Sequence, residues 1–256
     1  MSASIKFFLL VTLTSSSIGA YPVQGQFRKA VFDALTIKGH PDPPPKLWKV
    51  VAVPAALTIV GLVSMTGNGI LSRYDIQEAR NKNFPNFQTN IDDYLQFVPI
   101  VAVYGFNASG IKGKNNFGNR TALLIKSELI MAVLTFSLKN ITEVPRPDTG
   151  ETNSFPSGHT AQAFMAATFM AKEYGGKSIW YSVGAYSVAT SVGVLRVLNN
   201  RHWVSDVLVG AAVGILSTNI AYLTHQYKWG GQRNRVVLLP SYSGSVGGFY
   251  LSYNFR

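Results

Sequence analysis

Three short segments of the chain hold residue types that can bind a phosphoryl group and attack it through a histidine. They are residues 139–147, 156–159 and 196–206. Each segment alone is a weak signal, because short patterns of this kind occur by chance. Together they supply a nucleophile, a proton donor and a set of cations, so the interpretation of the chain rests on the whole set.

His202 and Asp206 are the candidate nucleophile and its orienting carboxylate. They are four residues apart at the start of an apolar stretch, so on a helix they share one face. The carboxylate can accept a hydrogen bond from Nδ1–H of the ring, which leaves the Nε2 lone pair outward and free to attack. The pair in isolation is also compatible with a structural role, and the other two segments favour the chemical one.

The second segment supplies the candidate anion site and proton donor. Gly158 allows backbone N–H groups to approach an anion, Ser157 adds a hydroxyl, and a helix start favours negative charge. His159 can protonate a leaving alcohol and later activate water. We expect Asn153 and Ser154 to cap the helix that begins here.

Lys139, Arg146 and Arg196 form the candidate charge clamp. Arginine binds two phosphate oxygens at once and lysine adds a compact charge, which together can stabilise the transition state without a metal. A single cation at the end of an apolar helix is more commonly an interfacial anchor, and Arg201 is open to either role. The four histidines are too dispersed for a zinc motif, so we expect neither a metal nor another cofactor.

The three segments resemble the signature of the type-2 phosphatidic-acid phosphatase superfamily, which includes class A acid phosphatases and vanadium haloperoxidases. The resemblance covers about residues 90–228, and it departs from the family at Leu195, where a serine is usual. It implies catalytic roles for His202, His159 and Asp206, with a phosphohistidine on His202. The substrate-binding residues that it implies are Lys139, Arg146, Ser157, Gly158 and Arg196.

Composition restricts the other classes of function. The 256 residues are 47% hydrophobic, which is compatible with a membrane protein but does not require one. The chain has no cysteine, so disulfides and thiolate metal sites are excluded. The net charge of +11 is spread in ones and twos beside apolar stretches, which argues against nucleic-acid binding and fits the basic flanks of membrane segments.

The chain divides into four parts by composition. Residues 1–20 have the layout of a signal peptide or an N-terminal anchor, and residues 21–45 that of a linker with a surface helix. Residues 46–228 form the expected phosphatase domain, and residues 229–256 a tail with a possible β-hairpin. The expected helices are six apolar segments at 47–66, 94–106, 119–138, 159–174, 178–195 and 203–227. The predicted fold is therefore all-α, a six-helix membrane-embedded bundle with a small C-terminal β-hairpin.

The alternation of these segments places all three motifs on one face of a membrane. Four basic clusters lie at the opposite ends, and the positive-inside rule makes that face cytoplasmic, so the active site faces the periplasm. A cleaved signal peptide would give the opposite orientation. The repeated loop charges favour the periplasmic one.

We interpret the chain as a multi-pass lipid phosphatase of a bacterial inner membrane. The resemblance implies hydrolysis of a phosphomonoester or pyrophosphate on a lipid such as phosphatidic acid, phosphatidylglycerol phosphate, lipid A or undecaprenyl pyrophosphate. The sequence does not choose among these lipids, and it leaves the oligomeric state open. The main alternative is a soluble periplasmic enzyme like the class A acid phosphatases. A vanadium haloperoxidase and a non-enzymatic lipid-binding membrane protein are weaker alternatives.

Overall fold

The computed structural model describes residues 47–67, 72–225, 236–243 and 246–253. The expectations for residues 1–20 and 21–45 lie outside these ranges. The chain forms two compact units, of which one holds residues 44–229 and the other residues 1–43 and 230–256. The first unit is helical in its described part and contains all three motifs.

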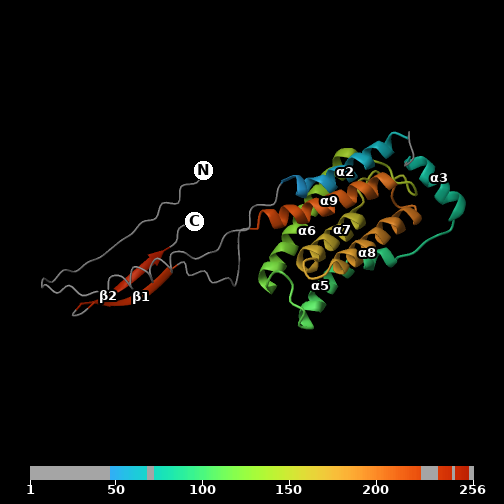
Figure 1. The fold of residues 1–256 in the computed structure, drawn as a ribbon. Helices are drawn as coiled ribbons and strands as arrows, with labels where there is room; N and C mark the ends of the chain where they lie inside the picture. The colour runs from blue at the N-terminus through green and yellow to red at the C-terminus, as the bar shows by residue number, and fades with distance from the viewer. Residues whose placement is uncertain (1–46, 68–71, 226–235, 244–245, 254–256) are drawn as a thin grey trace. The chain divides into compact units, whose positions relative to one another are not determined.

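The helical unit confirms the prediction of an all-helical main domain (Figure 1). Its described part contains eight helices rather than six. They are α2 (Leu47–Met65), α3 (Arg73–Asn83), α4 (Ile91–Leu95), α5 (Val98–Ala108), α6 (Phe117–Thr142), α7 (Gly158–Tyr174), α8 (Ile179–Leu198) and α9 (Val204–Leu223). Each of the six expected apolar segments overlaps mainly with one helix, and α3 and α4 are additional.

The two additional helices arise from the polar stretch before α5. Ser72 begins α3 by accepting a hydrogen bond from the backbone N–H of Asp75, and Arg80 anchors that helix by donating from Nε to the carbonyl of Leu198 at 2.8 Å. The single turn of α4 follows and ends just before α5, which begins with proline at its second position. Proline is well accepted in the first turn of a helix, so the chain restarts there instead of continuing α4.

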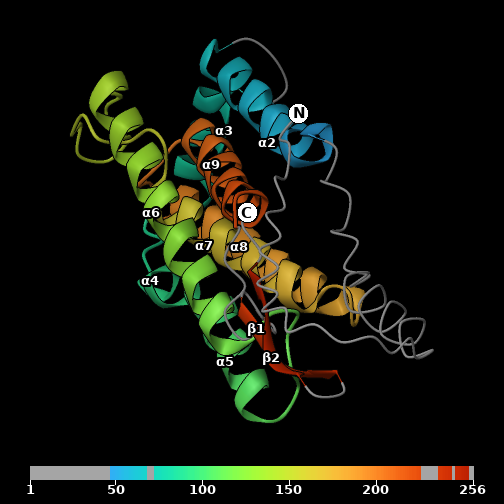
Figure 2. The ribbon, with the colours of Figure 1, turned by 90° about the vertical axis from the view of Figure 1, so that its left-hand side faces the viewer.

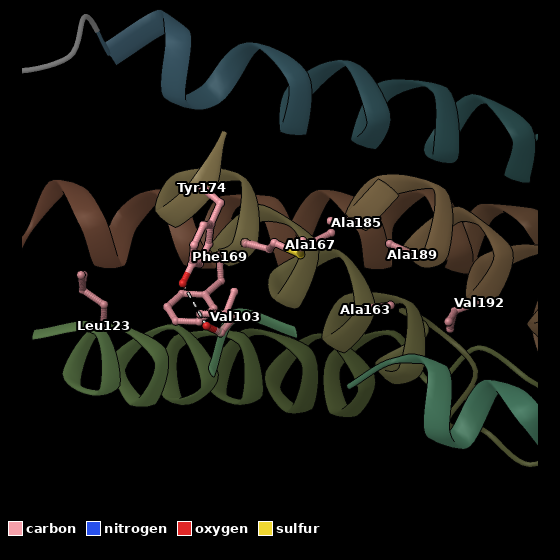
Figure 3. Packing of buried hydrophobic residues seen from close by; sticks show 10 residues of the cluster. Val103, Leu123, Ala163, Ala167, Phe169, Tyr174, Ala185, Ala189 and Val192 are labelled. Atoms are coloured by element: carbon pink, nitrogen blue, oxygen red, sulfur yellow. Dashed lines mark hydrogen bonds between the residues drawn. The ribbon is translucent and has the colours of Figure 1, made fainter. Parts of the chain in front are cut away.

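Helix α7 lies at the centre of the unit, where it packs against α5, α6, α8 and α9 (Figure 2). Most of its side chains are buried, and many are alanines, so its neighbours approach closely. Figure 3 shows one part of this core, in which the Tyr174 hydroxyl donates to the carbonyl of Val103 at 3.1 Å. The phenol thus satisfies a backbone acceptor of α5 while its ring packs beside Phe169.

Helices α7 and α9 are in backbone contact because α9 presents two glycines to α7. A Cβ atom on Gly210 would lie 2.6 Å from the carbonyl oxygen of Ser157, and one on Gly214 would lie 2.7 Å from the Met165 nitrogen. Small residues four apart allow helices to approach in this way. The backbone N–H of Ser157 also donates to the carbonyl of Asp206 at 3.0 Å, which joins the starts of the two helices.

The apolar surface of the unit is large. Among the described helices, α6 and α9 are long and apolar enough to cross a membrane by length and composition. Most of the apolar part of α9 is buried inside the unit, whereas most of that of α6 is not. Ile125, Leu129, Val133 and Phe136 form an exposed stripe along α6, each with more than half of its surface accessible. A continuous apolar face of this kind is rare on a water-soluble monomer.

The second unit contains two described strands, β1 (Val236–Ser243) and β2 (Val246–Tyr253), which pair antiparallel. The register runs from Val236 opposite Tyr253 to Ser243 opposite Val246. These strands lie within the tail at 229–256 for which a β-hairpin was predicted.

Candidate active site

The ends of four helices meet at one end of the helical unit, and the candidate residues lie on them. Lys139 is in the last turn of α6, His159 is in the first turn of α7, and Arg196 is in the last turn of α8. Helix α9 begins two residues after His202 and carries Asp206 in its first turn. The arrangement arises because successive helices run in opposite directions (Figure 2).

His202 and Asp206 lie beside each other as the spacing predicts. Nδ1 of His202 is 3.5 Å from Oδ2 of Asp206, and the two side chains are 2% and 0% exposed. The carboxylate also accepts from the backbone N–H of Trp203 at 3.0 Å and from the Ser205 hydroxyl at 3.2 Å. These donors fix the carboxylate beside Nδ1. The ring itself is more enclosed than we expected for a histidine with an outward Nε2.

Ser154 has a different position from the one that the sequence indicates. Residue Ser157, not Asn153 or Ser154, precedes α7, and it makes no side-chain capping bond. The Ser154 hydroxyl instead donates to Oδ2 of Asp206 and lies 3.4 Å from Nδ1 of His202. It therefore belongs to the histidine–aspartate pair, because the turn before α7 folds back over the start of α9.

Burial lowers the pKa of His202 to about 4, and the nearby charges of Arg196 and Arg146 act in the same direction. Asp206 opposes the shift but does not reverse it. The ring is therefore neutral at pH 7, which is the form that carries a lone pair for attack.

Arg196 is held mainly by a residue that lies outside the three motifs. Its Nη1 donates to Oδ2 of Asp92 at 2.7 Å, and the two side chains are 10% and 1% exposed. Asn199 donates to the other carboxylate oxygen at 3.2 Å. Among the described residues, the buried Nε of Arg196 has no hydrogen-bond acceptor, so this guanidinium retains a donor.

His159 also contacts a carboxylate, but in a more open setting. Its Nε2 lies 2.8 Å from Oδ1 of Asp93, with the side chains 33% and 50% exposed. Asp93 precedes the apolar helix α5 and follows Asp92 directly in the chain. Neither aspartate was among the site residues predicted from the sequence. Two adjacent carboxylates before an apolar stretch are costly to bury, and this is the signal that could have found them.

Lys139 and Arg146 are held by the loop between α6 and α7. Lys139 donates from Nζ to the carbonyl of Asn153, and Arg146 donates from Nε to the Asn153 side chain. Arg146 also lies 3.9 Å from a carboxylate oxygen of Glu151. Burial, together with the charge of Arg196, lowers the pKa of Arg146, so the two guanidinium groups are close enough to repel. Such a concentration of positive charge is suited to a multiply charged anion.

A pocket of about 450 Å³ opens beside these groups and is lined almost entirely by polar side chains. Arg146, His159 and Arg196 contribute to it, as do Asp93 and Asp148. Arg201 lines it too and pairs with Asp148 at 3.1 Å. The structure thus brings three of the predicted residues into the pocket. The others lie outside its lining: Lys139, Ser157, Gly158, His202 and Asp206.

Gly158 is the first residue of α7, and Ser157 precedes it. A Cβ on Gly158 would meet only Thr135, at 4.0 Å, so its backbone is open on that side. The buried Ser157 hydroxyl accepts from Thr160 at 3.0 Å. Within the described part of the chain, no three histidine, aspartate or glutamate side chains gather in a way that could hold a metal ion.

Comparison with known proteins places this site in context. The chain is 41% identical over 155 residues to a lipid A 1-phosphatase of Porphyromonas gingivalis, and the match covers 58% of this chain and 34% of that protein. The chain thus spans about a third of the length of this curated relative.

Two solved structures are also similar. One is LpxE of Aquifex aeolicus, at 22% identity and a TM-score of 0.44, covering 57% of this chain and 93% of that one. The other is a transmembrane PAP2-type phosphatidylglycerolphosphate phosphatase of Bacillus subtilis, at 20% identity and a TM-score of 0.44, covering 66% and 94%.

The family model of the PAP2 superfamily matches residues 121–230, a range that includes all three motifs. The resemblance that the motifs indicate is therefore confirmed over these residues, which match the PAP2 superfamily.

Proposed function

We propose that the protein is a membrane phosphatase that removes a phosphate from a lipid through a phosphohistidine on His202. The observation that carries the proposal is the neutral, buried His202 held by Asp206 beside two guanidinium groups. A neutral imidazole is a competent nucleophile, and the cations offset the charge of the phosphoryl oxygens as they are transferred.

The reaction has two steps. In the first, Nε2 of His202 forms a bond to phosphorus while the bond from phosphorus to the lipid oxygen breaks, and His159 gives its proton to that oxygen. In the second, His159 takes a proton from water as the water oxygen attacks phosphorus, and the bond to His202 breaks to release phosphate. Arg146, Arg196 and Lys139 bind the phosphoryl oxygens in both steps.

The exposed apolar stripe of α6 supports a membrane location and disfavours the soluble alternative. Ile125, Leu129, Val133 and Phe136 lie on the helix whose last turn carries Lys139. A lipid lying along this surface has its headgroup near the end of the unit where the candidate residues gather. We further propose that the chain crosses a bacterial inner membrane several times with this end in the periplasm, as the basic clusters at the opposite ends indicate.

The substrate class is the first point to test. The relative from Porphyromonas gingivalis is named a lipid A 1-phosphatase, so lipid A is the first candidate among the phosphorylated lipids. Detergent-purified full-length protein is to be assayed for phosphate release from lipid A, phosphatidic acid, phosphatidylglycerol phosphate and undecaprenyl pyrophosphate, each with and without EDTA. We expect release from at least one lipid that EDTA leaves unchanged. No release from any of them contradicts the proposed function.

The orientation can be tested directly because the chain has no cysteine. Thr152 is exposed in the loop before α7, and Lys177 is exposed at the opposite end of the unit. In intact cells, a membrane-impermeant maleimide is expected to label Thr152→Cys and to leave Lys177→Cys unlabelled until the membrane is broken. The reverse pattern would place the site in the cytoplasm, and labelling of both would indicate a soluble periplasmic protein.

A further inference from the structure

Asp93 lies beside both His159 and Arg196. In the proposed mechanism, His159 protonates the leaving group and Arg196 binds the phosphoryl oxygens. Its Oδ1 atom is 2.8 Å from Nε2 of His159 and 3.9 Å from Nη1 of Arg196. All three side chains line the same pocket. A single carboxylate oxygen therefore contacts both a proton donor and a cation of the site.

The neighbouring Asp92 shows what a permanently held carboxylate looks like here. Its side chain is 1% exposed, and it accepts from Arg196 at 2.7 Å and from Asn199 at 3.2 Å. The Asp93 side chain is 50% exposed, and among the described residues its carboxylate contacts no donor besides His159 and Arg196. Asp93 can therefore turn towards water, whereas Asp92 cannot do so without leaving Arg196 unpaired.

A phosphoryl group competes with this carboxylate for the same donors. Two anions within about 4 Å of each other repel strongly where water screens them only in part. A phosphoryl group that reaches His159 and Arg196 must therefore displace Asp93, and the return of Asp93 to the two groups favours the departure of phosphate.

We propose that Asp93 is a displaceable carboxylate that competes with the phosphoryl group for His159 and Arg196 and so limits how tightly the site holds phosphate. The inference rests on the proposed function, because that function assigns these two groups to the substrate. It adds a residue that adjusts the affinity for substrate and product, and it leaves the bond-forming steps unchanged.

The test measures binding of orthophosphate, so that it does not depend on turnover. Isothermal titration calorimetry on the detergent-purified full chain would compare the wild type with Asp93→Asn, which keeps the shape of the side chain and removes its charge. We expect Asp93→Asn to bind orthophosphate roughly tenfold more tightly, because the competing charge is gone. In an assay of lipid hydrolysis, the same variant is expected to show stronger inhibition by orthophosphate.

Asp148 provides the matched control. It lines the same pocket but pairs with Arg201, and it does not contact His159 or Arg196 among the described residues. Asp148→Asn is expected to tighten orthophosphate binding by less than about threefold. An equal gain in both variants would overturn the proposal, because it would indicate only a general change of charge in the pocket.

Other outcomes separate this proposal from the proposed function. If Asp93→Asn lowers kcat without tightening orthophosphate binding, Asp93 only positions His159 and the proposal is wrong. If the wild type hydrolyses no phosphorylated lipid and Asp93→Asn still binds orthophosphate more tightly, the proposed function fails and this inference stands. Absence of orthophosphate binding in every variant overturns it. Asp93→Ser serves as a second variant if Asp93→Asn does not fold.

Discussion

The site contains two histidine–aspartate pairs that differ in almost every physical respect. His202 contacts Asp206 through Nδ1, and both side chains are nearly inaccessible. His159 contacts Asp93 through Nε2, and both side chains are partly exposed. A buried pair keeps one geometry and one protonation state, whereas an exposed pair can exchange its partner for another group. The first pair is suited to a nucleophile, and the second to a proton donor that must meet both lipid and water.

The largest effect is expected from His202→Ala. Loss of the nucleophile should reduce phosphate release by roughly 10,000-fold or more and should prevent formation of a phosphoprotein. Rapid-quench trapping with radiolabelled substrate measures the second effect. His225 lies at the other end of the helical unit, on the chain just after α9, and His225→Ala is the control expected to keep most of the activity. A phosphoprotein that persists in His202→Ala would mean that another residue is the nucleophile.

Removal of each carboxylate's charge compares the two pairs directly. Asp206→Asn should lower kcat by roughly 100- to 10,000-fold, because an amide in that position can favour the wrong tautomer of His202. Asp93→Asn should lower kcat by less than about tenfold, because His159 remains accessible to lipid and water. Steady-state kinetics with the lipid that the panel identifies gives both values. Equal losses in the two variants would show that the pairs do not differ in function.

A smaller effect should follow from Gly210→Ala, which tests the backbone contact beneath the buried pair. The added methyl group must displace the Ser157 carbonyl or move α9, so we expect roughly a tenfold lower kcat and a loss of about 1–3 kcal/mol in stability. A Cβ atom on Gly184 of α8 would have no neighbour within 4 Å, so Gly184→Ala is the control. Thermal unfolding in detergent, measured beside activity, would reveal the difference. Similar behaviour of the two variants would mean that α7 and α9 can separate without loss.

The smallest effect concerns protonation of the buried ring. With a pKa of about 4 against an ordinary value of 6.5, the folded protein binds fewer protons at His202 than the unfolded chain does between these values. Protonation of His202 therefore leaves the free energy of unfolding unchanged above about pH 6.5. As the pH drops from 6.5 towards 4, it lowers that free energy, because the unfolded chain takes up the proton first. Side-chain ¹⁵N NMR should show a neutral His202 at pH 6, with the resonance assigned by its loss in His202→Ala. Titration near pH 6.5 would contradict this.

The sequence allowed prediction of features that depend on near neighbours or on alternation of segments. Six apolar segments became helices, and the i, i+4 spacing brought His202 and Asp206 together. The sequence did not reveal contacts between distant segments. Asp92 is 104 residues from Arg196, and Ser154 is 52 residues from Asp206, so no local pattern connects them. The pair of adjacent carboxylates was visible, but its partners depend on how α4 packs against α7 and α8.

The contact between the starts of α7 and α9 affects which substitutions the site can accept during evolution. The Ser157 N–H bonds to the carbonyl of Asp206, and Gly210 lies beneath the Ser157 carbonyl. Backbone atoms rather than side chains make this joint, so most substitutions around the pocket leave it untouched. Residues at the rim of the pocket can therefore be replaced while the starts of α7 and α9 keep their alignment.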